Sequence, residues 1–126
     1  MESTKILIVE DDYETQFFYK LFLGKLYDIE FCRTDVAFYE LIYKNKFNLV
    51  IMDLAIKGSK DGLALTRELR SMENYKDVPI ICLSAHVMQQ DKERAYLAGV
   101  DIFLEKPVRN EKLLDTISNF IRSKAS

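Results

Sequence analysis

Short apolar runs alternate along this chain with longer segments in which apolar residues recur every three or four positions. The run at 48–53, Asn-Leu-Val-Ile-Met-Asp, is too short for a capped helix and ends in a carboxylate. Polar residues precede it, and a stretch rich in Gly, Ser and Asp follows. A continuous apolar run with such borders is typical of a strand covered on both faces. We therefore predict a buried central strand, with Asp53 at its carboxyl end.

Four further short runs predict the other strands, at 5–9, 29–32, 79–83 and 101–105. The segments between them have helical periodicity and predict five helices. In the first, the apolar residues Phe18, Tyr19, Phe22, Leu23 and Leu26 recur at helical spacing between Tyr13 and Leu26, and Gly24 or the following segment closes the helix. The second follows a cap at Thr34 or Asp35, with Phe38, Leu41 and Ile42. The third helix is expected from about Asp61, with Leu65, Leu69 and Met72 on one face. The fourth spans Gln89 to Leu97 and is stopped by Gly99. The fifth follows a cap at Asn110 and carries Leu113, Leu114, Ile117, Phe120 and Ile121.

This alternation favours parallel strands joined by right-handed crossovers. For 126 residues it predicts an α/β fold, a doubly wound five-stranded parallel sheet of order 2-1-3-4-5 with five helices on its two faces. That order brings the carboxyl ends of strands 1, 3, 4 and 5 side by side. The polar residues at those ends, which we expect in one crevice, are Glu10, Asp11, Asp53, Ser84 and Lys106.

Three carboxylates in one crevice raise one another's energy unless a proton or a cation lies between them. Oxygen ligands without His or Cys favour Mg²⁺, which accepts one or two carboxylates and keeps several waters. A carboxylate can also be the nucleophile in phosphoryl transfer, a reaction that needs position and positive charge around the phosphoryl oxygens. Asp53 lies in the middle of the row, where the Lys106 ammonium supplies charge and the Ser84 hydroxyl a hydrogen bond.

With these residues in order, the chain resembles the receiver domain of bacterial two-component response regulators. The motifs that carry the resemblance are Ile6-Leu7-Ile8-Val9-Glu10-Asp11-Asp12, Met52-Asp53-Leu54, Asp61-Gly62, Leu83-Ser84-Ala85-His86, Ala98-Gly99-Val100-Asp101 and Glu105-Lys106-Pro107. Each motif is weak alone, but their order and spacing agree. The resemblance covers residues 1–126 as a single receiver domain, either stand-alone or excised from a longer regulator or hybrid kinase.

The resemblance implies a phosphorylation-dependent signalling switch. Asp53 would accept a phosphoryl group from a phosphohistidine on a histidine kinase or histidine phosphotransfer protein. The chain would catalyse only its own phosphorylation and dephosphorylation. It also implies that Asp11, Asp53 and the backbone carbonyl of Ala55 bind Mg²⁺, with Glu10 acting through a water.

The resemblance also assigns the residues that change the partner-binding surface. Ser84 and Phe103 take the family's two switch positions, and Lys106 takes its basic position, before a Lys106–Pro107 bond that resembles the family's cis peptide. The downstream protein is unknown. Two departures concern the loop after Asp53, which is one residue longer than the common pattern and has Lys57 where many receivers have proline. A third is Phe103, which lacks the hydroxyl that many members have there.

The first predicted helix has more apolar residues than one buried stripe requires. Phe17 and Leu21 share a flank beside that stripe, so an exposed apolar strip is expected. Receivers dock phosphodonor helical bundles on this helix, and we predict that Phe17 and Leu21 contact the donor. The alternative is that both are ordinary core or boundary residues.

Composition excludes several classes of protein. A net charge of −2 argues against a direct nucleic-acid or anionic-membrane binder, and no apolar stretch approaches membrane-spanning length. No signal peptide is expected, and the two cysteines, Cys32 and Cys82, form no C-x-x-C pair and give no positive support for a disulfide, which together favour a cytoplasmic protein. With one histidine, the sequence does not announce a multi-His metal site.

Three alternative functions stay open at this point. The chain could be a receiver-like interaction module that acts without phosphorylation, although the complete set of Asp11, Asp53, Ser84 and Lys106 argues against this. A flavodoxin-like mononucleotide binder has the same topology, but the stretch after the first strand is acidic rather than rich in Gly, Ser or Thr. A small phosphatase with an aspartyl nucleophile lacks a second acid two residues beyond Asp53.

Overall fold

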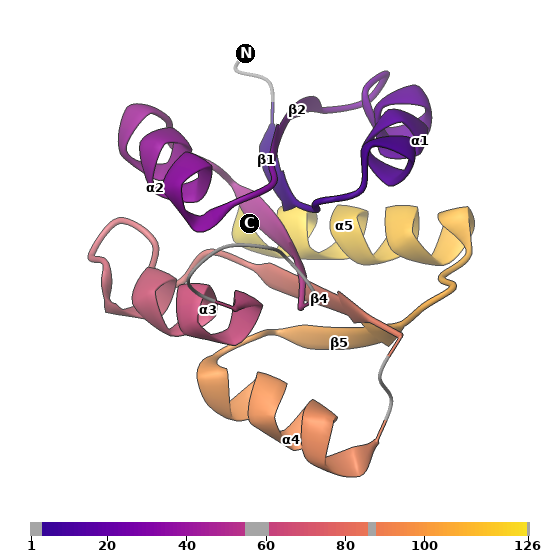
Figure 1. The fold of residues 1–126 in the computed structure, drawn as a ribbon. Coiled ribbons are helices and arrows are strands. Elements are labelled where there is room, and N and C mark those ends of the chain that lie inside the picture. The colour runs from indigo at the N-terminus through magenta and orange to yellow at the C-terminus, as the bar shows by residue number, and fades with distance from the viewer. Residues whose placement is uncertain (1–3, 55–60, 86–87, 126) are drawn as a thin grey trace.

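Five parallel strands form one sheet in the order β2-β1-β3-β4-β5 (Figure 1). The computed structural model describes residues 4–54, 61–85 and 88–125. The strands are β1 (Lys5–Val9), β2 (Asp28–Cys32), β3 (Leu49–Asp53), β4 (Ile80–Ser84) and β5 (Ile102–Glu105). Every residue of β3 and β4 is buried, as expected of strands covered on both faces. The predicted strand order and fold class are confirmed.

The helices are α1 (Tyr13–Leu23), α2 (Asp35–Lys44), α3 (Gly62–Ser71), α4 (Gln89–Ala98) and α5 (Asn110–Ala125). Side-chain caps determine where three of them begin. The Asp12 carboxylate accepts the Thr15 backbone N–H, and Thr34 and Asp61 cap α2 and α3 in the same way. The caps at Asp12 and Thr34 follow β1 and β2 within three residues, so the chain there passes quickly from strand into helix.

The helices cover the sheet in two layers. α1 and α5 lie on one face, where Tyr19, Leu23 and Ile117 share a core cluster, and α2, α3 and α4 cover the other (Figure 1). The second cluster contains Phe38 of α2 and Leu65 of α3. Alternate residues of each central strand enter opposite clusters, so the continuous apolar runs fill both cores.

Three details of the expected helices were wrong. Phe18 and Leu26 are exposed, because Tyr19 and Leu23 face the sheet and α1 ends before Leu26 could continue their stripe. Phe18 instead packs edge-on against Phe22, with ring centroids 5.4 Å apart. The last helix already includes Asn110, since the Arg109 carbonyl accepts the first helical hydrogen bond.

Arg70 of α3 anchors the carboxyl-terminal end of α4. Its guanidinium donates to the carbonyl oxygens of Gly99 at 2.9 Å and Val78 at 2.7 Å, and to Asp101 Oδ2 at 2.8 Å. Gly99 has φ +119°, and a Cβ there would lie 2.7 Å from Arg70 Cγ. This end of α4 is thus fixed beside the amino ends of the strands, on the opposite side of the sheet from their carboxyl ends.

Cys32 and Cys82 are both buried and free, as expected of small apolar side chains in a core. Within residues 4–54, 61–85 and 88–125, no helix is long and apolar enough to cross a membrane.

Candidate functional site

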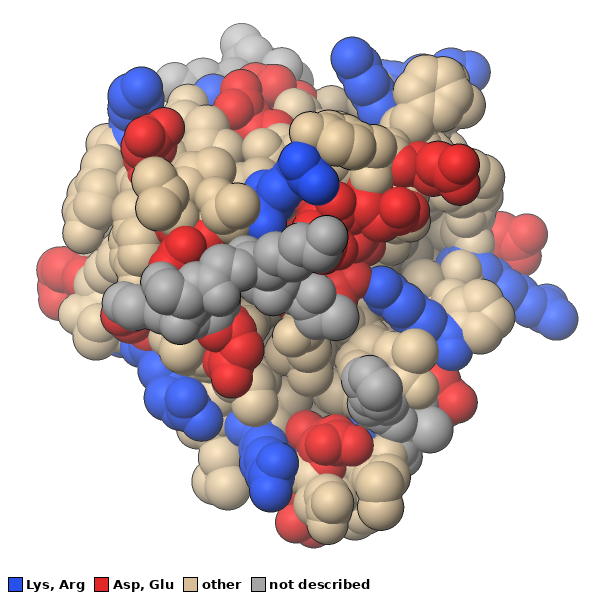
Figure 2. Space-filling model, in the orientation of Figure 1, with Lys and Arg blue, Asp and Glu red and all other residues tan. Residues whose placement is uncertain are grey.

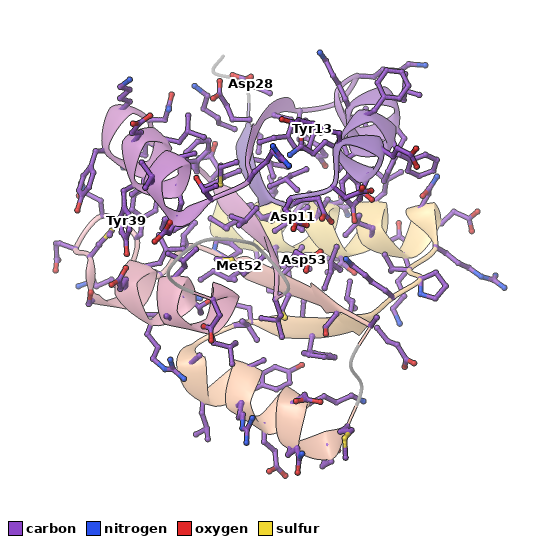
Figure 3. All side chains as sticks on the ribbon, in the orientation of Figure 1. Asp11, Tyr13, Asp28, Tyr39, Met52 and Asp53 are labelled. Atoms are coloured by element: carbon purple, nitrogen blue, oxygen red, sulfur yellow. The ribbon has the colours of Figure 1, made fainter. Side chains whose placement is uncertain are left out.

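Four of the predicted site residues, Glu10, Asp53, Ser84 and Lys106, meet at the carboxyl ends of the strands. Val9 pairs with Met52, so Glu10 and Asp53 follow at the same level of neighbouring strands. Ser84 ends β4 opposite Glu105, and the Lys106 backbone N–H donates to the Ser84 carbonyl at 2.9 Å. Figure 3 labels Asp11 and Asp53 at this end of the sheet. Acidic side chains also gather near the middle of the face in Figure 2, with Lys and Arg beside them.

Lys106 pairs with two carboxylates. Its ammonium donates to Asp53 Oδ2 and lies 3.6 Å from Glu10 Oε1. Both carboxylates are almost wholly buried, whereas the Lys106 side chain is 31% exposed. Burial alone would lower the pKa of Lys106, but the hydrogen bond and charge of Asp53, together with Glu10, raise it above its usual value. Lys106 therefore stays charged and points its positive charge at Asp53.

Glu10 holds a proton near neutral pH. Burial, a hydrogen bond with Asp53 and the charge of Asp53 raise its pKa from 4.5 to about 7, against the opposing effect of Lys106. The one ammonium of Lys106 thus faces two neighbouring carboxyl groups. This arrangement has an excess of oxygen donors, and a divalent cation could replace the proton.

Asp11 follows on the loop between β1 and α1. Its side chain is half-buried, and its backbone carbonyl accepts a hydrogen bond from Arg33 Nε at 3.0 Å. Asp12 points elsewhere: its carboxylate caps α1 and its backbone N–H donates to Glu10 Oε2 at 3.2 Å. Asp12 thus serves as the cap of α1, whereas the Asp11 carboxylate remains beside the crevice.

The donor set fits Mg²⁺ better than it fits a metal that needs a complete protein cage. In the part of the chain that the structure describes, no group of three His, Cys, Asp or Glu side chains could hold a metal ion by itself. Mg²⁺ asks for less, since one or two carboxylates and several waters suffice. The neighbouring carboxyl groups of Glu10 and Asp53, with Asp11 next in the chain, supply hard oxygen donors whose mutual repulsion a cation would relieve.

Ser84 and Phe103 are both buried, at 3% and 9% exposure. Phe103 packs in the cluster under α2, α3 and α4, and its backbone N–H donates to the Tyr96 hydroxyl of α4 at 3.0 Å. Its aromatic ring is therefore already inward. The Lys106–Pro107 bond is cis, as expected. Ala55 and Lys57 lie outside the described residues.

Phe17 and Leu21 lie away from this cluster, on the outer surface of α1. They are 63% and 55% exposed, so the predicted exposed strip is present. Both line a groove of about 560 Å³ that also includes Tyr27 and Ile29.

Sequence reasoning missed Arg33 and Tyr96. Arg33 is a basic residue directly after β2, and the predicted sheet order puts that strand beside β1. This neighbourhood was a signal that could have identified it. No signal in the sequence pointed to Tyr96, because its hydroxyl reaches the β5 backbone only through the packing of α4.

Comparison with known families agrees with this geometry. The family model described as "Response regulator receiver domain" matches residues 6–118, which run from the second residue of β1 into α5. The chain is a response regulator receiver domain. Receiver domains are the phosphorylation-dependent switches of two-component signalling.

Relatives of this receiver domain include longer proteins and proteins of about its own length. The transcriptional regulatory protein RprY of Bacteroides fragilis is 30% identical over 122 residues, which are 96% of this chain and 50% of RprY. The chain thus spans about half the length of RprY. The polar-differentiation response regulator DivK of Brucella ovis is 25% identical over 120 residues, 94% of this chain and 97% of DivK.

A solved structure similar to this receiver domain contains magnesium. It is the receiver domain of the sensor histidine kinase PA1611 from Pseudomonas aeruginosa, with a magnesium ion coordinated in its active site cleft. It is 29% identical, has a TM-score of 0.85, and the match covers 95% of this chain and 98% of that chain.

Proposed function

We propose that this receiver domain accepts a phosphoryl group on Asp53 from a phosphohistidine of a histidine kinase or histidine phosphotransfer protein. The observation that carries the proposal is the contact of the buried Asp53 carboxylate with the Lys106 ammonium, beside the buried Glu10 side chain. A nucleophile held at a strand end beside a cation has the position and the positive charge that phosphoryl transfer requires.

In the proposed reaction, an Asp53 carboxylate oxygen forms a bond to phosphorus while the bond from phosphorus to the donor's imidazole nitrogen breaks. The electron pair of that bond stays on the imidazole, and Lys106 offsets the charge on the phosphoryl oxygens. Mg²⁺, when bound, supplies the remaining positive charge. Asp11, Asp53 and the Ala55 backbone carbonyl would hold it, with Glu10 acting through an intervening water.

The chemistry that we propose for this chain is limited to the formation and hydrolysis of its own acyl phosphate. Water later attacks phosphorus, which regenerates the Asp53 carboxylate and releases inorganic phosphate. The domain would thus catalyse only its own phosphorylation and dephosphorylation, with a signalling role.

Ser84 and Phe103 are the residues that we propose to transmit the change. The Ser84 hydroxyl would donate to a phosphoryl oxygen, and the β4–α4 connection would follow it. Phe103 is already buried, so the larger displacement is expected at the amino-terminal end of α4. Only Ala95 and Ala98 are buried among the residues of that helix, and a lightly packed element moves at low cost. The resulting surface of α4, β5 and α5 would bind an unknown downstream protein.

The test of this function is the response to beryllofluoride, which mimics a phosphoryl group on a carboxylate. With Mg²⁺, we expect it to shift the amide resonances of Ser84, Phe103 and the first turn of α4. Ser84→Ala should still bind the mimic but show much smaller shifts in α4 and at Phe103, because the transmitting hydrogen bond is missing. Thr116→Ala is the control, since the Thr116 hydroxyl donates only to the Lys112 carbonyl of the same helix, α5, among the bonds that the structure describes. Unchanged α4 resonances in the wild type would favour a module that acts without phosphorylation.

We further propose that the donor docks on α1. Phe17 and Leu21 present apolar side chains to solvent, and a second cavity of about 380 Å³ opens between α1 and Lys106, lined by Phe18, Phe22 and Pro107 among others. Apolar surface on α1 that reaches Lys106 through this second cavity suits a donor which must bring its phosphohistidine to Asp53.

Charged substitutions on this strip should slow transfer from the protein donor. We expect Phe17→Asp with Leu21→Asp to lower the second-order rate constant at least tenfold, because such anchors dominate interfaces. Val36→Asp on α2, an equally exposed apolar position, is the control. Phosphorylation by acetyl phosphate should stay unchanged in both variants. If transfer from a kinase that phosphorylates the wild type proceeded at the same rate in the double variant, docking would lie elsewhere.

A further inference from the structure

Arg33 joins the end of β2 to the loop that carries Asp11. Its Nε donates to the Asp11 carbonyl at 3.0 Å, and its Nη1 donates to the Tyr13 hydroxyl at 2.6 Å. The same guanidinium lies over the Tyr13 ring, with Cζ 3.9 Å from the ring centroid. One side chain therefore contacts both the β1–α1 loop, at Asp11, and the first residue of α1, Tyr13.

The other contacts of this loop hold its two ends. The Glu10 backbone N–H donates to the Cys32 carbonyl at 3.0 Å, and the Asp12 carboxylate caps α1. Between these ends, the Asp11 backbone is held by Arg33 from the neighbouring strand. The planar guanidinium suits this task because it can donate to the carbonyl, donate to the hydroxyl and stack on the ring together.

We propose that Arg33 and Tyr13 form a clamp that positions the Asp11 carboxylate for binding a divalent cation. This inference rests on the proposed function, in which Asp11 is a ligand of Mg²⁺. Arg33 is a positioning residue here, since it acts through the Asp11 backbone. Groups that orient metal ligands commonly change metal affinity tenfold or more when they are replaced.

The positive charge of Arg33 works against this positioning effect, because it repels a nearby cation. Repulsion weakens cation binding, whereas positioning strengthens it, and the two effects separate when the charge is kept and the shape is changed. Arg33→Lys keeps the charge but loses the planar fork and the stacking. Arg33→Ala loses both.

The test compares Mg²⁺ dissociation constants, measured by calorimetry, for wild type, Arg33→Lys, Arg33→Ala, Tyr13→Leu and the double variant Arg33→Lys with Tyr13→Leu. We expect Arg33→Lys to weaken Mg²⁺ binding about tenfold. Adding Tyr13→Leu to Arg33→Lys should raise the Mg²⁺ dissociation constant little further, because the two residues act as one unit. Arg122→Lys is the matched control, since Arg122 also donates to a hydroxyl, that of Ser118 on the same helix.

A measurement without metal separates the clamp from the proposed function. The Asp12 amide, whose N–H donates to Glu10, should exchange about tenfold faster in metal-free Arg33→Lys, because the loop opens more often. If Arg33→Lys bound Mg²⁺ like the wild type while Arg33→Ala bound it more tightly, Arg33 would act through its charge and the clamp would be wrong. A wild type that binds no Mg²⁺ would overturn both this inference and the proposed function, whereas unchanged Mg²⁺ affinity and unchanged amide exchange in Arg33→Lys would overturn the inference alone.

Discussion

Asp53→Asn is expected to abolish phosphoryl incorporation from acetyl phosphate. The substitution keeps the size of the side chain and a carbonyl oxygen for Lys106, but an amide is a far weaker nucleophile than a carboxylate. The fold should persist, because the amide group can still hydrogen-bond with Lys106 and Glu10 in their buried site. The loss would therefore report chemistry rather than unfolding.

Intact mass after incubation with acetyl phosphate and Mg²⁺ measures this directly. The wild type should gain one phosphoryl group, which depends on Mg²⁺, and Asp53→Asn should gain none. Asp115→Asn, at an exposed position on α5, should behave like the wild type. Equal incorporation into wild type and Asp53→Asn would place the acceptor at another residue.

Glu10→Gln is expected to stabilise the metal-free protein above neutral pH. Below about pH 4.5, Glu10 is protonated in the folded and the unfolded chain, and its contribution to stability is complete. As the pH rises toward 7, the unfolded chain loses this proton first, so the free energy of unfolding falls. The difference between the two pKa values corresponds to up to about 3 kcal/mol. A neutral amide avoids this loss, so the gain should appear at pH 8 and vanish near pH 4.5.

Urea unfolding with EDTA at several pH values tests this prediction. The free energy of unfolding of Glu10→Gln minus that of the wild type should rise between pH 4.5 and 7 and then level off. Glu40→Gln, an exposed position on α2, should show no such rise. A flat difference for Glu10→Gln would mean that the carboxyl group does not hold a proton in the folded protein. Saturating Mg²⁺ should stabilise the wild type more than the variant.

Much of this architecture was predictable because its signals are local. Strands such as β3 are continuous apolar runs, helices such as α2 and α3 begin at side-chain caps, and the alternation of the two determines a parallel sheet. The sheet order then brings Glu10, Asp53 and Lys106 together without knowledge of any distance.

The errors and omissions concern contacts between elements. The exposure of Phe18 depends on how α1 is rotated against the sheet, and its apolar character alone does not reveal this. Likewise, the contact of Arg33 with the Asp11 carbonyl depends on the alignment of β2 with β1. The proton of Glu10 follows from its burial beside Asp53, whereas the sequence predicts only that the carboxylates meet. The departures in the loop after Asp53 lie at residues 55–60, outside the described part of the chain.

The most direct test of the central claim is to locate the phosphoryl group. Borohydride reduces an aspartyl phosphate to homoserine, so the acceptor of the phosphorylated wild type can be identified by peptide mass spectrometry. We predict homoserine at position 53, formed only when Mg²⁺ was present during phosphorylation. Positions 11 and 12 should remain unmodified Asp. Homoserine at position 11 or 12, or a phosphorylated chain in which Asp53 is unchanged, would contradict the account.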